Sequence, residues 1–236
     1  MSIKENVARI RAEMEAAAIA AGRDPKSILL CAATKMNDAA AVREAIAAGV
    51  DCCGENKVQE LTAKLAENAY EGAPVHFIGH LQTNKVKQVV GKVDLIQSVD
   101  SERLLAAIDK EAKKQGIVQD ILLEVNVGGE ESKSGFHPDD ILPLVGKLPQ
   151  YPNIRVKGLM TIPPISQKNG DNVKFFQKMC NISVDIIALL GDNGMAKYLS
   201  MGMSDDFADA IANGSTMIRV GTAIFGARDY TKLHQN

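Results

Sequence analysis

Short apolar runs alternate with amphipathic stretches along almost the whole chain. The runs are nearly continuous, as in strands buried on both faces of a parallel sheet, and we predict strands over 28–33, 50–53, 75–78, 95–98, 121–127, 156–160, 198–201 and 217–225. Between them apolar residues recur at helical spacing, which predicts helices over 39–48, 57–68, 83–90, 102–115, 138–147, 173–190 and 205–212. One more helix is predicted over 4–21, ended by Gly22.

Eight strands that alternate with helices favour a closed (β/α)8 barrel of the TIM type over an open doubly wound sheet. No linker, low-complexity tract or charge block divides the sequence, so we expect one domain over residues 1–236. A long loop is expected after the sixth strand, over 163–170, and a short tail after the last, over 228–233.

Composition narrows the choice of partners. The chain has 236 residues, of which 46% are hydrophobic and 24% charged, and a formal net charge of -2. Such a balance gives no electrostatic reason to expect binding to nucleic acid or to an anionic membrane. The amino terminus lacks the apolar core of a signal peptide, and no apolar run is long enough to span a bilayer. We therefore expect a cytoplasmic protein.

The cysteines lack a metal-binding pattern. The chain has four, at Cys31, Cys52, Cys53 and Cys180, without the CxxC or Cys/His spacing of known metal sites. Most fall in predicted strands, where a buried, reduced thiol is the usual state in a cytosolic protein. The sequence thus predicts no metal site.

Chemically useful side chains follow several predicted strands, at the end where barrel enzymes place their active sites. Lys35 comes just after the first strand and before Asp38, which we predict to be a helix N-cap. There, partial desolvation could make its amine a Schiff-base nucleophile, although a solvated loop lysine is also compatible with the sequence. Asn56 follows the second strand and could bind a cofactor oxygen or cap a turn. His76 and His80 flank the end of the third strand, as core or catalytic groups.

Two stretches near the carboxyl terminus resemble phosphate sites. The segments 199–207 and 214–228 each read as a short strand that ends in small residues and runs into a helix. Ser200 in the first, and Gly221 and Thr222 in the second, offer hydroxyls and backbone N–H groups where helix N-termini attract anions. In a barrel, the loops after the seventh and eighth strands are a common phosphate site.

Together these blocks resemble one family across nearly the whole chain. Thr34-Lys35, the run Gly54-Glu-Asn-Lys-Val-Gln-Glu60 and the run His76-Phe-Ile-Gly-His-Leu-Gln-Thr-Asn-Lys85 are similar to the pyridoxal-phosphate homeostasis proteins. So are the segments 126–135, 158–160, 199–207 and 214–228. One departure is Met36-Asn37, where the family often has a polar residue and a proline. We expect it to alter only the entry to the next helix.

The resemblance implies a fold and a site. It implies a single barrel of the alanine-racemase type without that enzyme's extra β-domain, binding pyridoxal 5'-phosphate (PLP) as an aldimine on Lys35. It further implies that Ser200 and its neighbour Met201, with Gly221 and Thr222, surround the phosphate. Arg219 would face the pyridine nitrogen, and Asn56 completes the predicted cofactor site.

The residue types agree with such a cofactor, which needs an amine, a donor cluster for its phosphate and a partner for its ring nitrogen. An arginine can donate to that nitrogen but cannot leave it protonated, which disfavours carbanion chemistry. An ion pair of Arg219 with Asp205 or Asp206 is the alternative interpretation.

Three functions remain open. The first is a monomeric PLP carrier that buffers the cofactor or delivers it to apo-enzymes, without robust catalysis. The second is an amino-acid racemase of the same fold, which needs a second base besides Lys35. The third is a lysine-dependent barrel aldolase, which fits the fold but leaves the family-like blocks unexplained.

Overall fold

The fold is a closed barrel of parallel strands. The computed structural model describes residues 1–130, 132–165, 168, 170–190 and 197–226. Strands run in the order β1-β2-β3-β4-β5-β6-β7-β8, and β8 pairs with β1 to close the barrel. Their bounds are β1 (Leu29–Ala33), β2 (Cys52–Glu55), β3 (Val75–Phe77), β4 (Leu95–Val99), β5 (Gln119–Glu124), β6 (Ile154–Met160), β7 (Tyr198–Ser200) and β8 (Met217–Val220). The predicted (β/α)8 barrel is confirmed.

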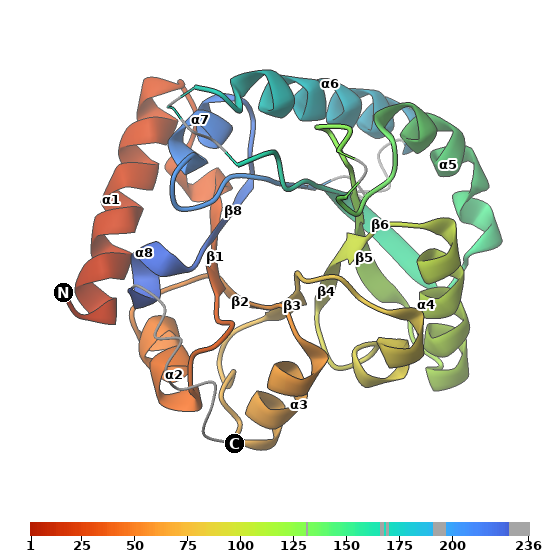
Figure 1. Ribbon diagram of the computed structural model, residues 1–236, viewed down its shortest axis with the longest axis horizontal. Helices are drawn as coiled ribbons and strands as arrows, with labels where there is room; N and C mark the ends of the chain where they lie inside the picture. Colours follow the sequence, from red (N-terminus) through yellow and green to blue (C-terminus); the bar gives the residue numbers. More distant parts are fainter. Residues whose placement is uncertain (131, 166–167, 169, 191–196, 227–236) are drawn as a thin grey trace.

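Helices surround the strands (Figure 1). The α-helices are α1 (Ile3–Ala20), α2 (Ala39–Ala47), α3 (Val58–Ala66), α4 (Glu102–Gln115), α5 (Ile141–Lys147), α6 (Val173–Leu190), α7 (Phe207–Ala212) and α8 (Thr222–Phe225). Short 3-10 helices are η1 (Pro25–Ser27), η2 (Thr83–Gln88), η3 (Pro138–Asp140) and η4 (Leu148–Gln150). None of the helices in the described part of the chain combines the length and apolarity that a bilayer crossing requires.

Most predicted elements are present, with differences at their ends. The helix predicted over 83–90 is the 3-10 helix η2, and the strand predicted over 50–53 is β2, shifted towards its carboxyl end. The strand predicted over 217–225 is wrong beyond Val220, because Gly221 leaves the extended conformation and α8 begins at Thr222. The tail predicted over 228–233 lies outside the described residues. Asp38 caps α2 as predicted, accepting from the Ala41 N–H at 2.8 Å.

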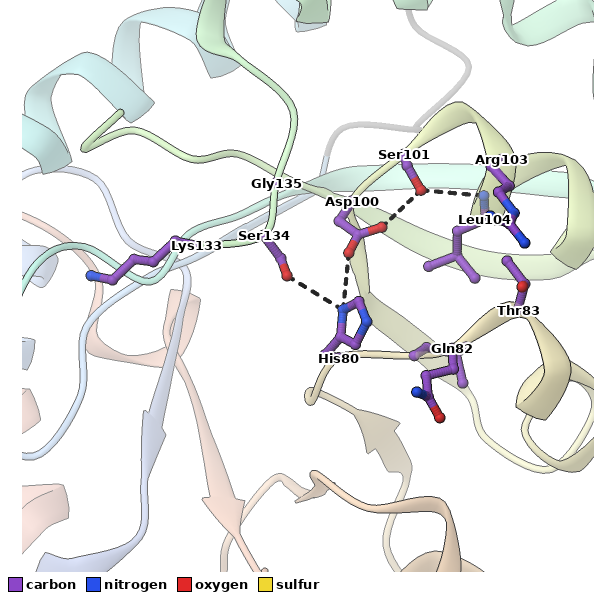
Figure 2. A pocket seen from close by; sticks show the side chains of 11 residues that line it. His80, Gln82, Thr83, Asp100, Ser101, Arg103, Leu104, Lys133, Ser134 and Gly135 are labelled. Carbon is purple, nitrogen blue, oxygen red and sulfur yellow. Dashed lines mark hydrogen bonds and ion pairs between the residues drawn. The ribbon is translucent and has the colours of Figure 1, made fainter. Parts of the chain in front are cut away.

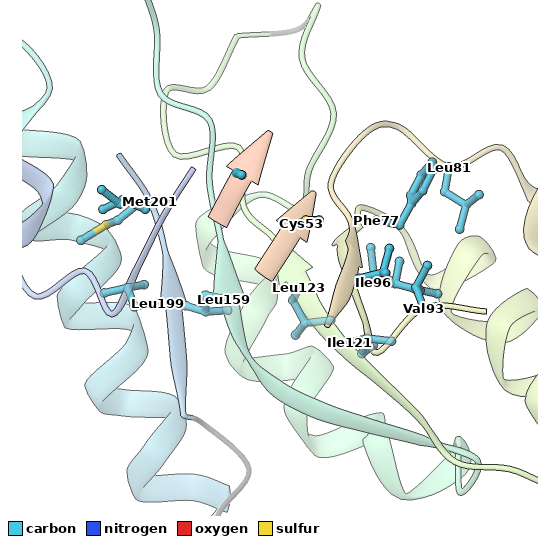
Figure 3. Close-up of a cluster of buried hydrophobic side chains, with 14 of the residues drawn as sticks. Cys53, Phe77, Leu81, Val93, Ile96, Ile121, Leu123, Leu159, Leu199 and Met201 are labelled. Atoms are coloured by element: carbon cyan, nitrogen blue, oxygen red, sulfur yellow. The ribbon is translucent and has the colours of Figure 1, made fainter. Parts of the chain in front are cut away.

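Strand side chains alternate between two cores, as the pleat requires. One set lies inside the barrel and forms a small apolar cluster of Cys31, Cys52, Leu95, Leu122, Met160 and Met217. The other set packs outwards against the helices in a much larger core (Figure 3), which includes Cys53, Ile96, Ile121, Leu123, Leu159, Leu199 and Met201. Alternation therefore decides which residues near a strand end can face the barrel interior.

One glycine allows a close approach between β6 and β7. Gly158 has a φ of 142°, and a Cβ there would lie 1.8 Å from the Tyr198 carbonyl oxygen. No other residue fits this position without moving the backbone.

The N-terminal helix supports the last turn of the barrel. Helix α1 begins with a capping box between Ser2 and Glu5, and it packs beside α7 and α8 (Figure 1). The buried Asn6 side chain donates to the Ile224 carbonyl at 2.8 Å, which ties α1 to α8. The segment after β8 is thus held by the other end of the chain.

Candidate functional site

Lys35 lies in a tight turn at the carboxyl end of β1. It is half-buried, and it follows Thr34, which is fully buried and donates its N–H to the Gly54 carbonyl at 2.8 Å. The next residue, Met36, is in the left-handed region with a φ of 62°, and its N–H donates to Glu60 Oε2 at 2.6 Å. Anchors on β2 and α3 therefore fix the turn on both sides of Lys35.

A buried ionic network lies beneath this turn. Lys64 Nζ from α3 contacts Glu55 Oε2 at 2.6 Å and donates to the Thr34 carbonyl at 2.7 Å. The same carboxylate oxygen accepts from Tyr70 Oη at 3.0 Å and from Thr34 Oγ1 at 3.1 Å. Burial and the charge of Glu55 raise the pKa of Tyr70, so it remains a donor. We name Glu55, Lys64, Tyr70 and Thr34 the outer network, because Glu55 points away from the barrel interior.

Asn56 offers a polar atom without a partner. Its backbone N–H donates to Glu55 Oε1 at 3.1 Å, so the outer network also holds this residue. Its side-chain Oδ1 is buried, yet has no hydrogen-bond partner within the described part of the chain. The backbone of Asn56 packs tightly against Gly79, where an added Cβ would lie 2.1 Å from the Asn56 carbonyl oxygen. This contact limits any shift of Asn56. A buried unpaired acceptor costs free energy, and a ligand donor would relieve that cost.

Arg219 is a buried cation with neutral partners. Its guanidinium donates to Ser200 Oγ at 2.7 Å and to the Thr161 carbonyl at 2.8 Å. No carboxylate lies within ion-pair distance of it among the described residues. Asp206, one alternative partner suggested by the sequence, accepts instead from Asn172 Nδ2 at 2.7 Å and from the Met203 N–H. Burial lowers the pKa of Arg219, and a ligand acceptor would compensate for lost hydration.

Ser200 forms a hydrogen bond with Arg219 inside the barrel. It is fully buried, and its hydroxyl donates to Gln97 Oε1 at 2.7 Å while accepting from Arg219. Met201, the next residue, points the other way: its side chain packs beside Leu199 in the outer core (Figure 3). The backbone N–H of Met201 donates to the Met217 carbonyl at 3.1 Å and its carbonyl accepts from Ser215 Oγ at 2.8 Å, so the structure does not favour the predicted contact of Met201 with the cofactor.

Gly221 and Thr222 lie beside the end of β1. Gly221 is the N-cap of α8, and the N–H groups of Ile224 and Phe225 bond back to its carbonyl. The earlier N–H groups of such a turn have no acceptor within the helix. A Cβ on Gly221 would lie 3.4 Å from Ala33, two residues before Lys35. An anion bound at this turn would therefore lie next to Lys35.

Sequence reasoning missed Glu124, at the end of β5. It is 7% exposed, and burial, with the charge of Asp100 adding to it, raises the pKa of its carboxyl to about 7. The positive charge of Arg219 lowers the pKa of Glu124 and so offsets part of this rise. A buried carboxyl poised near neutrality is typical of a functional site, but the sequence alone shows only one more glutamate.

A hollow with a volume of about 450 Å³ lies between the loops that follow β3, β4 and β5 (Figure 2). His80 lies there, and its Nδ1 contacts both Asp100 Oδ2 at 3.1 Å and Ser134 Oγ at 3.3 Å. These partners are far apart in sequence and could not be paired with His80 beforehand. Because both touch the same nitrogen, they cannot relay a proton through the ring as a catalytic triad does.

The structure brings most of the predicted residues together. Lys35, Asn56, Gly221 and Thr222 lie at the neighbouring ends of β1, β2 and β8, which pair in register. Ser200 and Arg219 lie in the barrel interior and bond to each other. The sequence did not predict Gln97, which joins Ser200 to His76, or Lys64, which reaches the site from α3.

Comparisons with known proteins identify the family of this chain. Residues 2–229 match the family model described as alanine racemase, N-terminal domain. A pyridoxal phosphate homeostasis protein of Aquifex aeolicus is 40% identical over 98% of this chain and 100% of its own length. That of Escherichia coli K12 is 37% identical over 98% of both chains.

Several solved structures are similar to this chain in fold. The PipY protein of Synechococcus elongatus with PLP bound is 33% identical, with a TM-score of 0.80 over 95% of this chain and all of that one. A D-threonine aldolase from Filomicrobium marinum, at 17% identity and a TM-score of 0.73, shares the fold alone. The chain belongs to the pyridoxal phosphate homeostasis protein family, built on the barrel of the alanine racemase N-terminal domain.

Proposed function

We propose that this protein binds PLP through a Schiff base on Lys35 and serves in PLP homeostasis by holding the cofactor and releasing it to apo-enzymes. The observation that carries the proposal is the approach of the turn after β8 to the end of β1, where Gly221 lies against Ala33, two residues before Lys35 in the chain. An amine and an anion-binding turn side by side suit an aldehyde that carries a phosphate. PipY, whose solved structure has PLP bound, supports the choice of ligand.

The residues present fit the cofactor's polar groups. When bound, PLP supplies an aldehyde that exchanges between amines. Thr222 and the first-turn N–H groups of α8 would hold the phosphate. Arg219, whose partners in the protein are neutral, would donate to the ring nitrogen, and Ser200 would position Arg219. The unpaired Oδ1 of Asn56 would accept from a ligand hydroxyl.

The chain's own groups favour holding over catalysis. Arg219 cannot transfer a proton to the ring nitrogen, so the bound ring would remain a weak electron sink. Racemization also needs a second base opposite the lysine. Tyr70 is bound to Glu55, and Tyr198 begins β7 at the barrel end away from Lys35. We therefore expect amino acids to be racemized slowly or not at all.

One observation favours the racemase alternative. Glu124 is an interior carboxyl whose pKa is about 7, suited to exchanging protons at neutral pH. Racemization of a panel of amino acids by the wild type and by Glu124→Gln decides between the functions. A turnover near 10 per second, an ordinary enzyme rate, that is lost in the variant would replace the carrier function with the enzyme function.

Chemical trapping tests the site. Borohydride reduction of the PLP-loaded protein, followed by peptide mapping, should place the pyridoxyl group on Lys35. Lys35→Ala should lose both the yellow colour and the label, whereas Lys57→Ala, at an exposed lysine two residues from β2, should keep them. A label on another lysine in the wild type would refute the assignment.

Delivery needs its own measurement. The PLP-loaded protein is incubated with an excess of an apo-enzyme, and recovered enzyme activity is followed with time. We expect transfer, together with a monomer in solution by light scattering. The free thiols at Cys31, Cys52, Cys53 and Cys180 suit a reducing compartment such as the cytoplasm. An acceptor that stays inactive would leave binding intact and refute delivery.

A further inference from the structure

Three soft ligand groups meet inside the barrel, below the proposed cofactor site. Cys31 on β1, Cys52 on β2 and His76 on β3 each offer one ligand atom, and these atoms lie within 4.8 Å of one another. Cys31 and Cys52 are register partners on adjacent strands, and His76 pairs with Gly54, two residues beyond Cys52. The three are 0%, 2% and 6% exposed. We name them the inner cluster.

We propose that the inner cluster binds a single thiophilic metal ion with a filled d shell, Zn²⁺ or Cu⁺. Two thiolates and an imidazole are the ligand types that select these ions over Mg²⁺ or Ca²⁺. This site shares no ligand with the proposed PLP site, since none of its three residues is among the groups assigned to the cofactor.

The spacing suits a metal after a small contraction. Bonds of about 2.3 Å to sulfur and about 2.0–2.1 Å to nitrogen place ligand atoms roughly 3.5–4 Å apart. The inner cluster, at separations up to 4.8 Å, needs only side-chain adjustments to reach that distance. Met217, whose sulfur lies in the same interior layer, accepts from Gln97 Nε2 at 3.1 Å and is a soft atom near the cluster.

The charges balance without a redox step. Two sulfur–hydrogen bonds are replaced by two sulfur–metal bonds, and two protons leave for solvent, so a divalent ion makes the site neutral. Arg219, the cation near Cys31, favours the anionic sulfur that a Cu⁺ complex would retain.

Gln97 would orient the imidazole. Its amide lies 2.9 Å from His76 Nδ1, which leaves Nε2 as the nitrogen that can bind a metal. In metal sites the second histidine nitrogen donates to an oxygen, so metal binding would turn the Gln97 amide: its Oε1 would accept from Nδ1–H in place of the Ser200 hydroxyl, and its Nε2 would face Ser200. Because Gln97 also contacts Ser200, which contacts Arg219, a metal here would influence the arginine above it.

The test uses the full-length, reduced protein without PLP, titrated under anaerobic conditions. Cd²⁺ serves as the spectroscopic probe, through its ultraviolet sulfur-to-metal charge transfer, and Zn²⁺ and Cu⁺ are tested by competition with chelators of known affinity. We expect one ion per chain, with release of protons. Cys31→Ser, Cys52→Ser and His76→Gln should each weaken binding by at least tenfold to a hundredfold, by analogy with metal-site mutations.

Cys180→Ser is the matched control, because Cys180 is a half-buried thiol on α6, away from the barrel interior. Circular dichroism and thermal unfolding show which variants fold, and a metal-induced rise in melting temperature should occur in the wild type and Cys180→Ser only. Absence of binding, or binding that survives in folded Cys31→Ser and Cys52→Ser, refutes the proposal. Either result leaves the PLP-binding proposal untouched, since borohydride labelling of Lys35 is measured separately.

Discussion

The two sides of the barrel mouth stabilise their polar groups in opposite ways. On the β1–β2 side, the Glu55 carboxylate has a cation, Lys64, at 2.6 Å and donors from Tyr70 and Thr34. On the β7–β8 side, the Arg219 cation donates to the hydroxyl of Ser200 and to the Thr161 carbonyl. We name the first the lysine side and the second the arginine side. Among the described residues, the buried carboxylate of the lysine side has an opposite charge in contact, whereas the buried guanidinium of the arginine side has none.

This difference separates scaffold from binding surface. A complete buried pair rigidifies the segment that bears it, and Lys64 fixes the Thr34 carbonyl directly before Lys35. Arg219 lacks an anionic partner among the described residues, and a buried cation is stabilised when a ligand acceptor binds to it. The arginine side therefore has affinity for such a ligand. We infer that the lysine side holds Lys35 in one geometry, and that the arginine side binds a ligand acceptor through Arg219.

We expect the largest effect on stability from removing Lys64, the cation that pairs with Glu55 on the lysine side. Lys64→Met leaves the Glu55 carboxylate buried without its ion-pair partner, and breaking a buried pair typically costs about 3–5 kcal/mol of unfolding free energy. Chemical denaturation without ligand measures the loss. Lys57→Met is the control, because the Lys57 side chain is 61% exposed and lies 3.7 Å from Glu60.

A double variant separates charge from shape. Glu55→Gln with Lys64→Met removes both charges and should recover much of the lost stability, because no uncompensated ion stays buried. If Lys64→Met alone costs no more than Lys57→Met, the lysine side is not held by this pair, and the comparison between the two sides fails.

Glu124 gives a pH-dependent prediction in the barrel interior. Its pKa is raised from 4.5 to about 7, so the folded protein holds the proton more tightly than the unfolded chain. The resulting stabilisation is fully present below pH 4.5 and is lost as pH rises towards 7, by about 3 kcal/mol at 1.36 kcal/mol per unit.

Glu124→Gln removes this dependence, since an amide does not titrate. Unfolding free energies of wild type and variant are compared from pH 4 to pH 8, and their difference should shift in favour of the variant as pH rises. Glu71→Gln, at an exposed carboxylate, is the control and should give a constant difference. A constant difference for Glu124→Gln as well would show that its carboxyl titrates normally.

The sequence predicted the barrel and the polar residues that follow its strands, because both depend on local patterns: apolar runs, helical periodicity and short motifs such as those around Lys35 and Arg219. It could not predict contacts that depend on barrel closure. Lys64 looks like an ordinary helix lysine until α3 packs over β2, and His80 meets Asp100 and Ser134 only when three loops converge. The β8 boundary was missed because apolar residues continue from Val220 into α8.

Thr222 gives a smaller effect on the phosphate side. Thr222→Ala removes one charge-assisted hydrogen bond, worth about 1.5–3 kcal/mol, so PLP affinity should fall about tenfold to a hundredfold. Absorbance titration measures it, and pyridoxal, which lacks the phosphate, should bind both proteins almost equally. Equal losses for pyridoxal and PLP would show that Thr222 does not touch the phosphate.

The smallest predicted effect is at Asn56, whose buried Oδ1 has no hydrogen-bond partner among the described residues. Asn56→Ala deletes a buried acceptor that has no partner in the ligand-free protein, so ligand-free stability should not fall. PLP affinity should still drop, by about threefold to tenfold, for one neutral hydrogen bond of about 0.5–1.5 kcal/mol. Asn84→Ala, at an exposed asparagine on η2, is the control and should change neither quantity. A variant that loses stability but keeps its PLP affinity would mean that Asn56 is part of the scaffold and does not contact the ligand.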